Sequence, residues 1–136
     1  MQTWDTTVAA SAQAYANTCP SGHSGTSYGE NLAFGWPTED IPTAVGDWVS
    51  EGTSFTYSTS NSNTCSDICG HYTQIIWATS VSFGCGRASC PSLAGKGQGE
   101  VTVCQYSVIV FVFFWQSSFR FFHDLLLLLN KLFVLI

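Results

Sequence analysis

Two histidines and two glutamates have the side chains needed to hold a metal ion, and they occur in the order His23, Glu30, Glu51 and His71. Neutral imidazole nitrogens are good ligands for Zn²⁺ and other divalent cations, and a carboxylate behind an imidazole orients the ring by accepting its second N–H. Where these four side chains face one another, His23 and His71 could bind a divalent cation, and the two glutamates could orient the rings or complete the coordination. Two protein ligands bind zinc more weakly than a closed four-ligand site, and we expect no cofactor to be required.

Hydrolysis is an alternative use of the same residues. In a metal-assisted hydrolase, His23 and His71 would be the ligands, and Glu30 or Glu51 would be the general base. A catalytic zinc normally has three protein ligands, however, and the chain has no His-Glu-x-x-His motif. Ser24 and Ser50, which lie next to candidate residues, also lack the Gly-x-Ser-x-Gly motif of a nucleophile elbow. We name no catalytic residue and favour a binding function over an enzymatic one.

The segment that leads to Glu30 begins with a helical pattern. Asp5 can cap a helix whose apolar residues recur at helical spacing as far as Asn17. A loop rich in serine and glycine follows over residues 20–29, and we predict a short helical turn over residues 30–34. His23 and Glu30 should therefore flank a single loop.

A second helix carries Glu51. Its pattern begins after Asp40 and is predicted to stop at Gly52, with Glu51 in the last turn. A carboxylate at that end opposes the helix dipole, so we expect Glu51 to have a partner elsewhere in the fold. A polar loop over residues 53–69 and a helix over residues 71–77 follow.

The strand patterns come last in the chain. Residues 81–88 and 100–106 read as two strands that form a hairpin. Helices that precede strands, with no repeated strand-helix-strand unit, predict an α+β sandwich and argue against a doubly wound sheet. A length of 136 residues is enough for one compact domain.

Short motifs surround the four candidate residues. They are His23-Ser24-Gly25, Gly29-Glu30-Asn31-Leu32, Trp48-Val49-Ser50-Glu51 and the run from Gly70 to Trp77. In this order these motifs resemble the CAP superfamily, named for cysteine-rich secretory proteins, antigen 5 and pathogenesis-related 1 proteins, and above all its pathogenesis-related 1 branch. The resemblance covers roughly residues 1–107 and implies a disulfide-stabilised, three-layer α-β-α sandwich. It also implies a shared cleft whose histidines can take a divalent cation.

All six cysteines lie within residues 1–107. An even number of cysteines in a small domain indicates disulfides and an oxidising compartment, so we expect an extracellular, secreted protein. Spacing leaves the pairing open, although the predicted hairpin would place Cys85 opposite Cys104. The family resemblance implies the bridges Cys19–Cys90, Cys65–Cys69 and Cys85–Cys104.

Lipid binding is a further implication of the resemblance, because members of the family bind sterols or fatty acids. In some of them sterol contact is attributed to the loop after the helix that carries Glu51, which corresponds here to residues 48–57. Phe55 and Tyr57 are therefore the predicted lipid-binding residues, with plain packing of both rings as the alternative. We expect a monomer that binds sterol-like lipid in defence or host-pathogen interaction. A purely structural or partner-binding disulfide module is the remaining alternative.

Charge and the two ends of the chain limit the function further. Eight of the nine acidic residues but only Arg87 and Lys96 of the basic ones lie in residues 1–107, a formal charge of −6 that disfavours nucleic-acid binding. No signal peptide opens this sequence, and we expect it to lack the family's first helix. Residues 108–136 are strongly apolar and depart from the family pattern. We expect this tail to be non-native or weakly membrane-associated.

Overall fold

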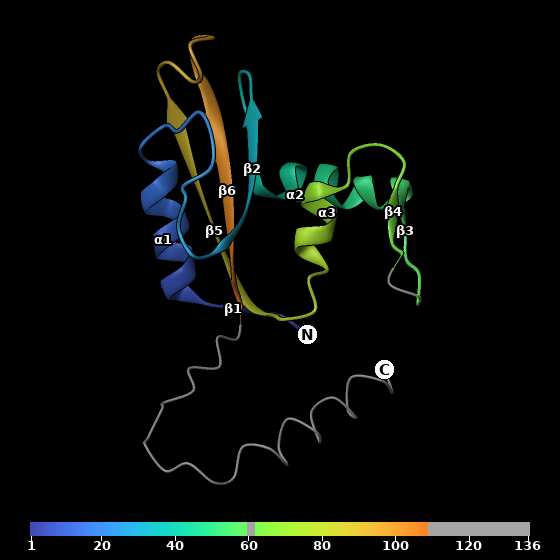
Figure 1. The fold of residues 1–136 in the computed structure, drawn as a ribbon. Helices are drawn as coiled ribbons and strands as arrows, with labels where there is room; N and C mark the ends of the chain where they lie inside the picture. Colours follow the sequence, from blue (N-terminus) through green and yellow to red (C-terminus); the bar gives the residue numbers. More distant parts are fainter. Residues whose placement is uncertain (60–61, 109–136) are drawn as a thin grey trace, which may run out of the picture.

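The computed structural model describes residues 1–59 and 62–108, and Figure 1 shows their arrangement. The elements are β1 (Thr3–Trp4), α1 (Thr6–Ala16), β2 (Gly29–Gly35), α2 (Ile41–Ser50), the 3-10 helix η1 (Glu51–Ser54), β3 (Phe55–Thr56), β4 (Thr64–Cys65), α3 (Gly70–Ile75), β5 (Ser80–Cys90) and β6 (Gly99–Val108). Four strands form a sheet in the order β1-β5-β6-β2, while β3 and β4 form a separate two-stranded sheet. The predicted tail over residues 108–136 lies outside the described residues apart from Val108.

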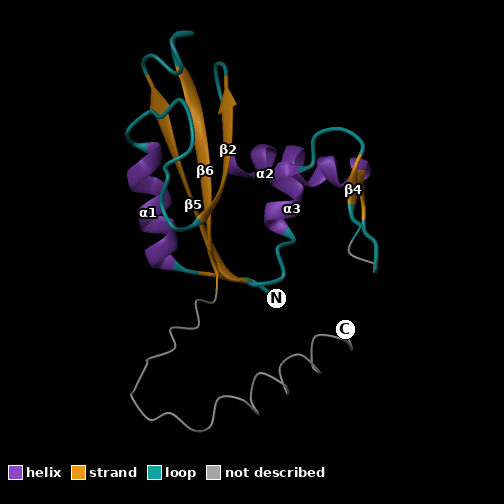
Figure 2. Ribbon diagram, viewed as in Figure 1, coloured by secondary structure: helices purple, strands orange, loops and turns teal. Residues whose placement is uncertain are grey.

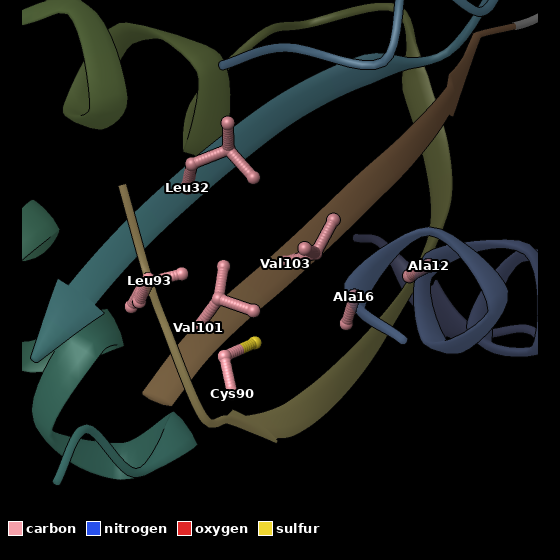
Figure 3. Packing of buried hydrophobic residues seen from close by; sticks show 7 residues of the cluster. All are labelled: Ala12, Ala16, Leu32, Cys90, Leu93, Val101 and Val103. Atoms are coloured by element: carbon pink, nitrogen blue, oxygen red, sulfur yellow. The ribbon is translucent and has the colours of Figure 1, made fainter. Parts of the chain in front are cut away.

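The main sheet lies between two helical layers, with α1 on one face and α2 and α3 on the other (Figure 2). Each face has its own buried cluster. On the α1 side, Ala12 and Ala16 pack with Val101 and Val103 of β6 (Figure 3). On the other side, Trp48 of α2 packs in a cluster with the hairpin strands. The structure therefore confirms the predicted α+β, three-layer α-β-α sandwich.

The two long helices begin at the predicted caps. Asp5 Oδ1 accepts hydrogen bonds from the backbone N–H groups of Thr7 and Val8, at 2.7 and 3.2 Å. Asp40 Oδ1 accepts one from Thr43 N at 2.8 Å. These side chains satisfy backbone donors that have no partner inside the first turn of a helix, which is why both positions start helices.

The predicted helical turn over residues 30–34 is wrong, because this stretch is β2. It pairs antiparallel with β6, and Glu30 lies opposite Gln105 while Leu32 lies opposite Val103. Leu32 is buried in the cluster under α1. A short apolar stretch has too few residues to show a period, so its long-range pairing with β6 decides its conformation.

The second helix ends at the predicted place, since α2 runs to Ser50 with Glu51 as its C-cap and Gly52 as the next residue. The chain then continues as the 3-10 helix η1, which runs to Ser54. A side chain at residue 52 would place its Cβ 2.7 Å from Tyr72 Cε2, so glycine is needed here for close packing. The third predicted helix is shorter than expected, since α3 ends at Ile75.

The hairpin and its disulfides agree with prediction. Strands β5 and β6 pair antiparallel, with Cys85 opposite Cys104 and a Cα–Cα distance of 4.1 Å between them. The three disulfides are Cys19–Cys90, Cys65–Cys69 and Cys85–Cys104. They confirm the pairing implied by the resemblance. Among the described residues, no helix is long and apolar enough to cross a membrane.

Candidate functional site

The first candidate pair joins the 20–29 loop to the start of β2. His23 Nδ1 lies 3.0 Å from Glu30 Oε1, and Ser24 N donates to the same oxygen at 2.8 Å. The other carboxylate oxygen, Oε2, accepts a hydrogen bond from Gln105 Nε2 at 2.8 Å. Burial acts to raise the pKa of Glu30, but the hydrogen bonds from Gln105, Ser24 and His23 outweigh it and lower that pKa below its ordinary value. Hydrogen bonds therefore fix the carboxylate of Glu30, which orients the ring of His23.

The second pair joins the end of α2 to the start of α3. His71 Nδ1 lies 2.6 Å from Glu51 Oε1, while the backbone N–H groups of His71 and Tyr72 donate to Glu51 Oε2 at 3.0 and 3.2 Å. Cys69, at the helix start, provides no side-chain cap of its own. Glu51 therefore caps α3 from a distant part of the sequence, which is the partner expected for a carboxylate at this position.

Packing and charge fix the His71 ring further. The indole of Trp48 stacks on it, with 5.8 Å between ring centroids and 22° between planes. Burial acts to raise the pKa of Glu51, but hydrogen bonds from His71 and Tyr72 lower it below the ordinary value. With Nδ1 of each histidine facing a carboxylate, the tautomer that donates from Nδ1 leaves a lone pair on Nε2. Neither Nε2 has a partner among the described residues.

Asn31 connects the two pairs. It follows Glu30 in β2, and its Nδ2 donates to the backbone carbonyl of His71 at 3.0 Å. Helix α3 lies close to the start of this strand, since a Cβ at Gly29 would be 2.5 Å from the side-chain amide of Gln74. Both His–Glu pairs therefore adjoin the same end of β2.

The metal prediction is only partly tested by this arrangement. The structure forms two separate pairs, His23 with Glu30 and His71 with Glu51. Over residues 1–59 and 62–108, no group of three or more His, Cys, Asp or Glu residues could hold a metal ion. A two-histidine site with carboxylates behind the rings fits the available donors, and it stays a prediction.

The two predicted lipid-binding aromatics have different surroundings. Phe55 in β3 is half-buried, and its ring packs against Tyr72 with 5.7 Å between centroids. Tyr57 follows the strand and is 72% exposed. Figure 1 shows that β3 and β4 lie beyond α2 and α3, away from the main sheet. Phe55 thus contributes packing, and Tyr57 offers a ring to the solvent.

Two residues that hold the pairs escaped the sequence analysis, Asn31 and Gln105. Both are buried amides on strands, and Gln105 lies between the buried residues Cys104 and Tyr106. A polar amide inside an apolar strand was the available signal, because buried polar groups need hydrogen-bond partners. Gln105 Oε1 is itself buried without a partner among the described residues.

The layers, disulfides and paired His–Glu residues define a small, disulfide-bonded α-β-α sandwich. The chain belongs to the CAP family, the cysteine-rich secretory protein family, whose profile matches residues 2–106. It is 41% identical over 107 residues to "Pathogenesis-related protein 1" of Arabidopsis thaliana, covering 76% of this chain and 62% of that protein. It is 46% identical over 96 residues to "Pathogenesis-related protein 1A1" of Solanum lycopersicum, covering 66% and 53%. The chain thus spans less than two thirds of the length of these relatives.

Solved structures show the same fold. BmVAL-1 aligns with a TM-score of 0.60 and 27% identity, covering 79% of this chain and 58% of that one. MpPR-1i aligns with a TM-score of 0.54 over 80% of this chain and 74% of that one; at 22% identity this likeness concerns the fold alone. The expected pathogenesis-related 1-like CAP protein is confirmed.

Proposed function

We propose that this chain is a secreted binding domain of the pathogenesis-related 1 type that acts in defence or host-pathogen interaction. It takes a sterol-like lipid at the β3–β4 hairpin and a divalent cation between His23 and His71. Three disulfides suit a domain that works in an oxidising, extracellular compartment. The names of the relatives, which are pathogenesis-related proteins, support the defence assignment. The domain works as a monomer and without nucleic acid.

The exposure of Tyr57 is the observation that carries the lipid proposal. Its ring is 72% exposed on a short hairpin, and Ile68 is exposed in the adjacent Cys65–Cys69 loop. The hairpin itself pairs Phe55 with Cys65, so this loop and the aromatics share one part of the molecule. Removing apolar surface from water stabilises a complex by about 25 cal/mol per Å². A tyrosine ring also has a hydroxyl that can meet the polar end of a sterol.

A titration with labelled sterol tests the lipid proposal. We expect the oxidised chain to bind sterol and Tyr57→Ala to bind it several-fold more weakly, since the exposed ring supplies contact area. Trp36→Ala is the matched control. Trp36 is another exposed aromatic residue, and it follows the C-terminal end of β2, outside the β3–β4 hairpin. Failure of the unmodified chain to bind sterol would refute the proposal.

The cation proposal rests on the free Nε2 atoms of the two histidines. Each imidazole has Nδ1 directed at a glutamate, and this is the usual arrangement of a metal-binding histidine with its carboxylate partner. A bound Zn²⁺ would be a Lewis acid with open coordination positions. We expect calorimetry to show weak Zn²⁺ binding that becomes weaker still in His71→Ala. Unchanged affinity in that variant would contradict it.

The hydrolase alternative has less support from the carboxylates. A general base works best with a pKa near the operating pH, whereas hydrogen bonds hold the pKa values of Glu30 and Glu51 below their ordinary value. Both carboxylates orient a histidine, and Glu51 also caps a helix. Metal-dependent turnover that disappears in a folded Glu51→Gln variant would favour the hydrolase. Absence of both sterol and metal binding would favour a purely structural or partner-binding module.

A further inference from the structure

We propose that Asn31 is a positioning residue that sets the separation between the imidazoles of His23 and His71. This inference rests on the proposed cation site. Asn31 contacts the backbone of His71 and touches no atom of either imidazole in the hydrogen bonds it makes. Its effect on a bound cation would therefore act through the placement of α3.

The side chain of Asn31 is fixed on both sides. It is 1% exposed, and its Nδ2 donates to His71 O at 3.0 Å and to Tyr106 Oη at 3.3 Å. Burial raises the pKa of Tyr106 to about 12, so the phenol stays neutral and keeps an oxygen that can accept. A buried amide with two partners on two elements allows little movement between those elements.

Successive residues of β2 hold one histidine each. Glu30 lies opposite Gln105, and Asn31 lies opposite Cys104. Since neighbouring residues of a strand point to opposite faces, Glu30 and Asn31 reach around the edge strand in opposite directions. Glu30 fixes the His23 ring, and Asn31 fixes the backbone of the helix that carries His71. The strand therefore serves as the common reference for both ligands.

A two-ligand cation site depends strongly on that reference. Zinc–nitrogen bonds are about 2.0–2.1 Å long, so a shift of α3 by about one ångström separates one ligand from the metal. Within the described part of the chain, the Asn31–His71 contact is the one hydrogen bond that joins α3 to β2. Loss of this contact leaves Glu51 bound to His71 but frees the pair to move relative to His23.

Zinc titration of a mutant cycle tests this inference in the full chain with Zn²⁺ alone. With Asn31 present, His23→Ala and His71→Ala should each weaken zinc binding. The double variant should lose less binding free energy than the sum of the two single losses, because each substitution removes a ligand of the same cation. Asn31→Ala should itself weaken binding by about tenfold or more, the usual effect of removing a residue behind a ligand. In the Asn31→Ala background, His23→Ala should then have little further effect.

Two further variants separate positioning from a general loss of packing. Thr102→Val removes a buried hydroxyl from β6, the strand next to β2. This hydroxyl donates to Glu39 O at 3.3 Å and contacts neither histidine. Tyr106→Phe removes the second partner of Asn31 and keeps the contact with His71. Thr102→Val should retain zinc affinity, and Tyr106→Phe should weaken zinc binding less than Asn31→Ala does, because the contact with His71 remains. Where Asn31→Ala fails to fold, Asn31→Ser, which keeps a small polar side chain, replaces it in the cycle.

The possible outcomes are distinct. Tenfold or larger weakening in Asn31→Ala, with the coupling between the histidines lost, supports the inference. Folded Asn31→Ala or Asn31→Ser with unchanged affinity and coupling overturns it and leaves the cation proposal standing. Equal weakening in Thr102→Val also overturns it. Absence of zinc binding in the unmodified chain, or binding that is indifferent to both histidines, refutes the cation proposal and the inference together.

Discussion

Glu51 holds His71 by both its ring and its backbone. One carboxylate oxygen lies 2.6 Å from His71 Nδ1, and the other accepts from His71 N at 3.0 Å. A single side chain therefore orients a candidate ligand and caps the helix that carries it. The local stability of α3 and the geometry of the site depend on the same carboxylate.

Glu51→Ala should destabilise the domain as well as weaken cation binding. Loss of a capping side chain costs about 0.5–2 kcal/mol, and the His71 ring also loses its partner. Urea unfolding of the oxidised chain measures the change. Asp47→Asn, an exposed acid on α2, is the matched control and should be nearly neutral. Equal stability of Glu51→Ala and the unmodified chain would exclude the capping role.

Acid should destabilise the fold through the hydrogen-bonded carboxylates. Hydrogen bonding to Arg87, Glu39 N and Ser89 lowers the pKa of Glu100 from 4.5 to about 2. A lowered folded-state pKa contributes stability above pH 4.5 that is lost as the pH falls toward about 2. The same sign holds for Glu30 and Glu51. Between these pH values, the free energy of unfolding should fall less in Glu100→Gln than in the unmodified chain. An equal fall in both proteins would contradict the lowered pKa of Glu100.

Ionisation of Glu39 should destabilise the fold, which is the opposite of the effect expected for Glu100. Burial, followed by the charges of Asp47 and Asp40, raises its pKa, and its Oε1 is buried without a partner among the described residues. A raised folded-state pKa gives stability that is present at low pH and lost as the pH rises through that pKa. Glu39→Gln should therefore be more stable than the unmodified chain at neutral pH. Lower stability of this variant at pH 7 would show that the charge is needed.

The disulfides should contribute unequally. A native disulfide typically contributes about 2–4 kcal/mol, and less when it closes a short loop. Cys65–Cys69 spans 4 positions, whereas Cys85–Cys104 spans 19 and Cys19–Cys90 spans 71. Removal of Cys65–Cys69 by double serine substitution should therefore cost least in thermal unfolding. Free thiols at Cys85 and Cys104 in secreted material, found by mass mapping, would count against the oxidised domain.

Phe55 and Tyr57 should respond differently to substitution. Tyr57→Ala should weaken sterol binding with little effect on stability, because the ring is exposed. Phe55→Ala should lower stability as well, since it removes the packing against Tyr72. His23→Ala is the control, as it leaves this region intact. Equal effects of the two alanine variants on unfolding would contradict the packing difference.

Local patterns predicted much of this fold because their signals are contained in short stretches. The caps at Asp5 and Asp40 and the hairpin that joins Cys85 to Cys104 are such cases. Strand β2 was predicted wrongly, since its conformation depends on pairing with β6 far along the chain. Long-range pairing of this kind leaves no period in a seven-residue stretch.

The site was predicted in its parts and not in its connections. The resemblance of the surrounding motifs to the CAP superfamily indicated the four residues, and the dipole argument anticipated a partner for Glu51. The division into two pairs, and the roles of Asn31 and Gln105, follow from the register of β2 and β6. Register cannot be read from either strand alone, so these buried amides had no visible partners in the sequence.

The claim that the two His–Glu pairs form one cation site is tested most directly by nuclear magnetic resonance of the histidine rings during zinc titration. His23→Ala and His71→Ala assign the ring signals. We predict that the signals of both rings change together and saturate at one Zn²⁺ per chain. Response of a single ring, separate saturation of the two rings, or no response at either would contradict the shared site.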